Sequence, residues 1–407
     1  MAEQDMGRRE WLILGALIAI LFVAQAYVTY RFLVLPNPGA NDYYSRWAGA
    51  RALLIDGRNP YDLAVTREIQ DVIQIDHAEV GRGGFHYPLH VTFLFWPLIY
   101  VPYVWAQAIW QTILVWVTIG IVAVMMLRLH WRPSPPGMVG LLLAGIMFYP
   151  AARSVLLGQF TLHVTLFLAL SLLMWQRGHD GWAGIFLAAT SVKPQMVILI
   201  GVWLLLWAIR QRRWRFIGGV LGGGLAFLLM AMLLYPPWPL RFWEDTFRYS
   251  AVAGGNIPLA VFFEWLLPAY ADIARTAVSA VLIIIMLYTW WRAWRSHDEN
   301  AFLLALFWTI VVSVLVTFQT GTTNQAIFLI PLFIWLYQGL QRWGVWPMTA
   351  VTALLLFCLW WLFLATISGD YENPLLFFPM PFFILAILVV IELKGGWHLE
   401  SAPTSHP

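Results

Sequence analysis

"WLILGALIAILFVAQAYVTYRFLVL", residues 11–35, is an apolar run long enough to cross a membrane as a helix. A hydrocarbon core about 30 Å thick requires about 20 residues at a rise of about 1.5 Å per residue. Arg8 and Arg9 precede the run, and "AQA" at 24–26 has the small residues of a signal-peptide cleavage site. The run is nevertheless longer than the apolar region of a signal peptide. We therefore predict that it is an uncleaved first membrane span.

Similar runs recur along the 407-residue chain, which is 61% hydrophobic and only 11% charged. Soluble domains contain roughly 25% charged residues, so the composition excludes a soluble globular protein. The sequence predicts an all-α fold: a polytopic transmembrane helical bundle with about 12 crossings, forming a single integral membrane domain over residues 1–407. The apolar segments that we expect to be helical are 11–34, 90–129, 138–152, 159–176, 182–192, 195–210, 216–235, 273–292, 301–318, 325–340, 347–366 and 375–393.

The basic residues predict the orientation of the spans. Arginines recur in alternate short connections, as in "RQRRWR" at 210–215, which is typical of cytoplasmic loops. Both termini, including the tail 394–407, are then cytoplasmic in a multi-pass plasma-membrane protein, and segments 36–88 and 236–272 are external. The net charge of +3 gives no indication of a nucleic-acid partner, and membrane lipids are the expected surroundings.

The first external segment contains "NPGANDYYSRWAGARALLIDGRNPYD" at 37–62. We expect a helix to about Ile55, capped by Asn41 or Asp42, and a second helix over 62–76 after the turn. Both predicted helices are amphipathic, which is typical of helices that lie in the membrane interface. We therefore expect Asp42 to lie near the outer headgroup layer.

Asp42 has two readings at this point: an N-cap that also pairs with Arg46 at position i+4, or a reactive carboxylate. Other polar residues gather at the predicted outer ends of spans, whereas ion-coupled transporters keep ionisable groups near mid-membrane. This distribution favours a site at the outer interface. Besides Asp42, these residues are Arg46, His86, Tyr87, His90, Arg153, Gln159, His163, Lys193, Gln195, Arg241, Glu244, Asp245, Arg248, Gln319 and Asn324.

Three of these residues have contrasting individual readings. Lys193 precedes Pro194, which breaks the helix and frees backbone groups to line a cavity. Arg153 could instead lie at a helix end with its side chain extended to the membrane interface. His163 could instead be a packing residue on an apolar helix face. The sequence has no D-x-D pair, Walker loop or H-E-x-x-H motif, and its lone Cys358 cannot build a metal cluster. We expect neither a metal nor a cofactor.

Four motifs in order carry a family resemblance: "DYYSRWAGARALLIDGRNPYD" from residue 42, "FHYP" from 85, "LLGQ" at 156–159 and "SVKPQ" at 191–195. Together they resemble glycosyltransferase family 87, polyprenol-phosphate-mannose-dependent mannosyltransferase-like enzymes of the GT-C superfamily. The resemblance implies a GT-C-like fold and a sugar donor carried on a polyprenyl monophosphate. It also implies transfer with inversion at the anomeric carbon.

The resemblance implies that Asp42, the external acid after the first span, is the catalytic base. It maps Gln159, Lys193 and Gln195 onto the expected cavity. This sequence departs from the pattern at two positions: Leu89 follows Tyr87-Pro88 where related chains often have a second proline, and Thr161 stands where they often have asparagine.

We therefore expect a membrane glycosyltransferase that moves a hexose, mannose by the resemblance, from a polyprenyl-phosphate sugar to a hydroxyl of a glycan or glycolipid acceptor on the external face. The alternative is a transporter or flippase of lipid-linked substrates, which predicts inverted repeats and polar residues at mid-span. The expected site residues are the base Asp42, the phosphate-binding Lys193, Arg153 and Arg46, and the pocket residues Gln159, Gln195, Tyr87 and His163.

Overall fold

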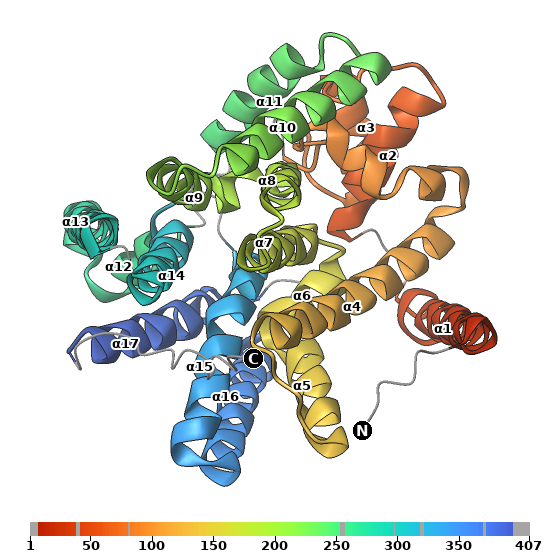
Figure 1. The fold of residues 1–407 in the computed structure, drawn as a ribbon. Helices are drawn as coiled ribbons and strands as arrows, with labels where there is room; N and C mark the ends of the chain where they lie inside the picture. Colours follow the sequence, from red (N-terminus) through yellow and green to blue (C-terminus); the bar gives the residue numbers. More distant parts are fainter. Residues whose placement is uncertain are drawn as a thin grey trace.

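The computed structural model describes residues 7–37, 41–79, 82–252, 257–296, 298–317, 321–368 and 372–393. Within these ranges the chain is helical and contains no strand, as expected for an all-α fold (Figure 1). The α-helices are α1 (Arg8–Thr29), α2 (Asp42–Leu54), α3 (Leu63–Ile73), α4 (Tyr103–Arg128), α5 (Pro135–Met147), α6 (Tyr149–Leu157), α7 (Thr161–Gln176), α8 (Asp180–Ala189), α9 (Ile198–Arg210), α10 (Trp214–Leu234), α11 (Trp238–Val252), α12 (Pro258–Leu266), α13 (Ala271–Ser296), α14 (Glu299–Val316), α15 (Leu329–Trp343), α16 (Val345–Thr366) and α17 (Pro379–Leu393).

Short turns of tighter or wider helix connect several of these elements. Helix α1 continues into a π-helical turn, Tyr30–Val34. The 3₁₀ turns are Leu89–Leu94, Trp96–Tyr100, Thr190–Val192, Pro194–Met196, Pro268–Tyr270, Thr322–Phe328 and Pro374–Phe377.

In the described part of the chain, seven helical segments are long and apolar enough to span a membrane. The count becomes eight if α5 and α6, which meet at a bend of 58°, form one broken span. The expected number of about 12 crossings is not confirmed. The seven segments are Arg8–Val34, Tyr103–Arg128, Trp214–Leu234, Pro268–Ser296, Glu299–Val316, Val345–Thr366 and Pro374–Leu393.

The sequence places most apolar segments well, but several are too short to count as full spans. Helix α7 has 16 residues, α8 has 10 and α9 has 13. At about 1.5 Å per residue, none of them reaches across a hydrocarbon core of about 30 Å. The predicted segments 182–192 and 195–210 are α8 and α9, which are separated by the two 3₁₀ turns around Pro194.

The spans divide into an inner and an outer group. The apolar cores of α4 and α14 are largely buried in the protein, whereas α1, α10, α13 and α16 expose most of their apolar side chains. Figure 1 shows α4 and α7 near the centre of the bundle and α1 and α13 at its periphery. Exposed leucine, isoleucine and phenylalanine along whole helices are typical of a lipid-facing surface.

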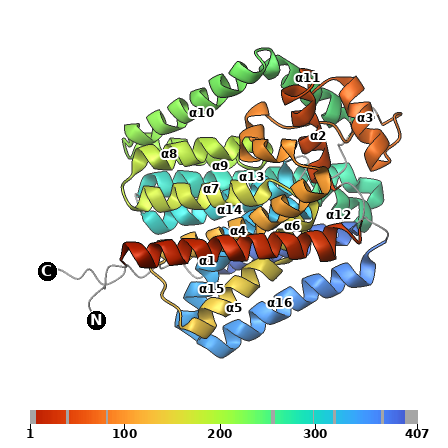
Figure 2. The same cartoon turned by 90° about the vertical axis from the view of Figure 1, so that its right-hand side faces the viewer.

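Helices α2, α3 and α11 lie together at one end of the bundle, the end at which α1 finishes (Figure 2). The two helices predicted in the first loop are therefore confirmed, as α2 and α3. They pack through Ala52, Val65 and Ile69, and Arg58 forms a bidentate pair with Glu68 at 2.7 and 2.8 Å across the turn. This arrangement positions α2 over the ends of the spans.

Candidate active site

The site begins where the N-terminus of α2 meets the C-terminus of α6. Asn41 is the N-cap of α2: its Oδ1 accepts hydrogen bonds from the backbone N–H of Tyr43 at 3.0 Å and from the hydroxyl of Tyr103 at 2.9 Å. Its Nδ2 donates to the carbonyl of Leu156 at 2.9 Å. Because Asn41 fills the cap position, the carboxylate of Asp42 is available for other contacts.

Gly158 allows the two helices to approach. It ends α6 in the left-handed region, with φ of 72°. A Cβ at this position would lie 2.6 Å from the Cβ of Tyr43, which is too close for any side chain. The Trp110 indole N–H donates to the Gly158 carbonyl at 3.0 Å and fixes this turn. The glycine therefore places the next residue, Gln159, against the start of α2.

Gln159 connects a carboxylate with an ammonium. Its Nε2 donates a hydrogen bond to Oδ2 of Asp42. Its Oε1 accepts from the Tyr87 hydroxyl at 3.1 Å and from Nζ of Lys193 at 3.1 Å. A lysine ammonium can only donate and an ionised carboxylate can only accept, so this chemistry permits only one orientation of the amide. Asp42 is exposed whereas Gln159 is buried, so the network runs from the surface into the bundle.

Lys193 lies in the break between α8 and α9 and is 6% exposed. Its Nζ donates to Oε1 of Gln159 and, at 2.7 Å, to Oδ1 of Asn324 in the turn Thr322–Phe328. Within the described ranges the ammonium contacts two amide oxygens and the Tyr87 hydroxyl, and no carboxylate pairs with it directly. A buried cation without a counter-ion costs several kcal/mol, by order of magnitude, so this position favours the binding of an anion.

Arg46 adds a second cation to the network. Its Nη2 donates to the Tyr87 hydroxyl at 3.2 Å, its guanidinium lies 4.7 Å from the centre of the Tyr87 ring, and its Nη1 donates to the backbone carbonyl of Asp42. Burial raises the pKa of the Tyr87 phenol, but Arg46 and Lys193 more than offset this effect and leave the pKa below its usual value.

Arg153 belongs to a neighbouring polar cluster. Its Nε lies 3.7 Å from a carboxylate oxygen of Glu372, which also accepts hydrogen bonds from the hydroxyls of Tyr149 and Thr322. The turn Thr322–Phe328 touches both clusters, because Thr322 contacts Glu372 and Asn324 contacts Lys193. Arg153 is thus close to the network in the fold but already faces a carboxylate.

The other two expected pocket residues lie outside the hydrogen-bonded network. The His163 ring stacks on Trp110, with centroids 5.0 Å apart, and is 6% exposed. Gln195 is half-buried in the turn Pro194–Met196, where its side chain has no hydrogen bond to another described residue. Their roles in a pocket stay predictions.

Sequence reasoning gave no role to Asn324 or Glu372, and it named Asn41 only as one of two possible caps of the first loop helix. Asn324 stood only in the general set of polar residues, although "TTNQ" at 322–325 is an unusually polar start for an apolar segment. Glu372 was not considered, because a single acid after a span carries no signal of its own. The described residues contain no group of three or more histidine, cysteine or acidic side chains that could hold a metal ion.

Comparison with known proteins now identifies the class. A family model described as glycosyltransferase family 87 matches residues 85–318, more than half of the chain. The chain therefore belongs to glycosyltransferase family 87 and is a membrane glycosyltransferase. No curated protein and no solved structure matches it. The matched region includes Tyr87, Gln159 and Lys193 but begins after Asp42, so the importance of Asp42 rests on its contacts.

Proposed function

We propose that this protein transfers mannose from a polyprenyl-phosphate donor to a hydroxyl of a glycan or glycolipid acceptor, with inversion at the anomeric carbon and with Asp42 as general base. The observation that carries the proposal is the hydrogen-bonded chain from Asp42 through Gln159 to Lys193. One amide holds the carboxylate that would accept a proton and the ammonium that would meet a leaving phosphate. A single network thus serves both ends of an inverting displacement.

The reaction balances with these groups. The acceptor oxygen attacks the anomeric carbon, and its proton passes to Oδ of Asp42. The bond between the anomeric carbon and the phosphate oxygen breaks, and the polyprenyl phosphate leaves with the electron pair. A positioned base of this kind contributes about 10²–10⁴-fold to the rate.

The developing charge on the phosphate would be met by two cations. Lys193 is buried and, among the described residues, hydrogen-bonded only to the neutral groups Gln159, Asn324 and Tyr87, so an anion would compensate its charge. Arg46 donates to the Tyr87 hydroxyl at 3.2 Å. Arg153 is a third candidate that would have to exchange Glu372 for the phosphate. With two cations against a monophosphate, the proposal requires no metal, and activity should persist in excess chelator.

We propose that the site faces the outside of the plasma membrane, with both termini in the cytoplasm, which requires an even number of spans such as the eight counted when α5 and α6 form one broken span. The polar helices α2 and α3 lie at the end of the bundle where α1 finishes, opposite the end where α1 begins. Lipid-linked donors present their phosphate at headgroup level, which suits a site at such an end. Cysteine labelling from outside at Asp56, which is exposed in the turn after α2, would test this orientation.

Transfer is best tested with the purified protein in lipid vesicles. Polyprenyl-phosphate mannose and polyprenyl-phosphate glucose are supplied separately with a panel of glycolipid acceptors, and the anomeric configuration of the product is determined by NMR. We expect a mannosylated product whose configuration is opposite to that of the donor. Product formed only with the glucose donor would contradict the assignment of mannose. A product that retains the donor's configuration would contradict inversion. Donor movement across the bilayer without product would support the flippase alternative.

A further inference from the structure

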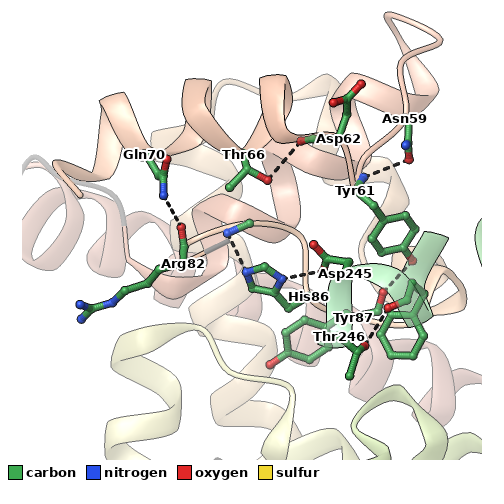
Figure 3. Close-up of polar contacts among 12 residues, drawn as sticks. Asn59, Tyr61, Asp62, Thr66, Gln70, Arg82, His86, Tyr87, Asp245 and Thr246 are labelled. Carbon is green, nitrogen blue, oxygen red and sulfur yellow. Dashed lines mark hydrogen bonds and ion pairs between the residues drawn. The ribbon is translucent and has the colours of Figure 1, made fainter. Parts of the chain in front are cut away.

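A buried acid on α11 lies against the segment that carries Tyr87. The Asp245 side chain is 1% exposed, and its Oδ2 lies 2.7 Å from Nδ1 of His86 (Figure 3). Its neighbour in sequence, Glu244, instead lies on the surface and pairs with Arg241. The two adjacent acids of α11 therefore face opposite environments, and only Asp245 is directed towards the site.

Both ring nitrogens of His86 are hydrogen-bonded. The backbone N–H of Gly84 donates to Nε2 at 2.9 Å, so Nε2 is the acceptor and Nδ1 carries the proton that is donated to Asp245. A Cβ on Gly84 would lie 2.9 Å from both Cε1 of His86 and Oγ1 of Thr66. Glycine is required at this position for the ring to fold back on its own loop.

Helix α11 holds the same loop at a second point. The Tyr61 hydroxyl donates to the backbone carbonyl of Tyr87 at 2.8 Å, and the Tyr61 ring packs against Phe242 of α11 with centroids 6.1 Å apart. Figure 3 shows Asp245 and Tyr61 reaching the loop at successive residues, His86 and Tyr87. The backbone of Tyr87 is thus fixed on the α11 side, while its hydroxyl contacts Gln159 and Arg46.

We infer that Asp245 is a positioning residue of the transferase: through His86 it fixes the loop so that the Tyr87 hydroxyl stays bonded to Gln159 and Arg46. The inference rests on the proposed function, because Gln159 is the link between the base and the phosphate-binding lysine. Because Asp245 is 1% exposed and lies against His86, the inference gives it no contact with a substrate. Asp245 affects the reaction through Tyr87, so its effect on activity should depend on the Tyr87 hydroxyl. A general contribution to folding would not depend on that hydroxyl.

A double-mutant cycle tests this dependence. Asp245→Ala should lower kcat/KM about tenfold in the otherwise native protein but less than about twofold in a Tyr87→Phe background. Asp245→Asn keeps an oxygen that accepts from Nδ1–H of His86 and should stay within about threefold of the native protein. Glu244→Ala, the matched surface change on the same helix, should leave activity unchanged. An equal loss from Asp245→Ala in both backgrounds would overturn the inference.

Hydrogen exchange provides a readout that does not require activity. In Asp245→Ala, amides of residues 82–92 should exchange faster than in the native protein, and Glu244→Ala should not change them. If the native protein transfers no sugar at all, the proposed function fails, and faster exchange would still support the positioning of the loop. Unchanged exchange in Asp245→Ala would overturn the inference whatever the activity.

Discussion

Gln159 donates a hydrogen bond to the carboxylate of Asp42, and these two residues are separated by 117 positions in the sequence. The contact exists because Asn41 caps α2 and because Gly158 lets α2 approach the end of α6. The sequence left open whether Asp42 caps α2 or has another role. In the structure Asn41 is the cap, and the carboxylate of the next residue, Asp42, contacts Gln159 instead.

Gln159→Glu should be more harmful than Gln159→Ala. The glutamate would place a second carboxylate against Asp42, and two adjacent carboxylates resist ionising together. We expect activity to fall by about 100-fold or more, with the pH optimum of the residual activity moved upwards. Rate profiles from pH 5 to 10 measure this shift, and an unchanged optimum in Gln159→Glu would contradict it.

Lys193→Met should separate stability from activity. Removal of a buried ammonium relieves a desolvation cost of several kcal/mol, by order of magnitude, while the loss of its bond to Asn324 costs about 1–3 kcal/mol. Tm should therefore be retained or raised, and transfer should fall by about 100-fold because the leaving phosphate loses its cation.

Arg128→Met is the control for Lys193→Met. Arg128 is also buried, but it donates to the Leu172 carbonyl and lies outside the Asp42 network. Its replacement relieves the same kind of desolvation cost, so Tm should again be retained or raised, but the activity of the folded protein should be unchanged. Full activity of the Lys193→Met protein would show that Lys193 does not bind the leaving phosphate.

Gly158→Ala should disturb the site although it removes no side chain of the Asp42–Gln159–Lys193 network. Alanine in the left-handed region costs roughly 1–2 kcal/mol, and the added Cβ would collide with Tyr43. Gly178 is a matched control, because its φ is 74° and nothing lies within 4 Å of an added Cβ. Both variants should lose some thermal stability, but only Gly158→Ala should lose transfer. Equal activity of the two variants would show that the approach of α2 to α6 is unimportant.

Tyr87→Phe should remove an alkaline limb from the rate profile. The lowered pKa of the phenol means that it ionises below its usual range, and the phenolate no longer has the proton that it donates to Gln159. The native activity should therefore decline as pH rises through the lowered pKa. The phenylalanine variant should be about tenfold less active at neutral pH, and any alkaline decline that it keeps should follow Lys193, whose pKa burial also lowers. An identical alkaline limb in both proteins would assign it to another group.

The helices were largely readable from the sequence, because apolar runs and Pro or Gly breaks mark their limits. The segment predicted at 62–76 is helix α3, Leu63–Ile73, and its cap is Asp62, whose carboxylate accepts from Ala64. The number of crossings was not readable, because a run such as 182–192 is equally apolar whether it spans a membrane or ends inside the protein.

The sequence predicted several residues of the site but not the contacts between them. The break at Pro194 singled out Lys193, and the position after the first span singled out Asp42. Pairings such as His86 with Asp245 or Arg153 with Glu372 join residues far apart in sequence. No periodicity or spacing links such residues, since only the packing of α6, α11 and the turn Thr322–Phe328 brings them together.

Asp42→Asn removes the proposed general base and leaves the rest of the network in place. The asparagine has nearly the same shape but cannot accept the proton of the acceptor hydroxyl. Asp56→Asn, on an exposed residue of the same loop, is the control. With polyprenyl-phosphate mannose and acceptor in vesicles, the account predicts a loss of kcat of about 10²–10⁴-fold in Asp42→Asn and no loss in Asp56→Asn. An Asp42→Asn protein that keeps most of its transferase activity would contradict the account.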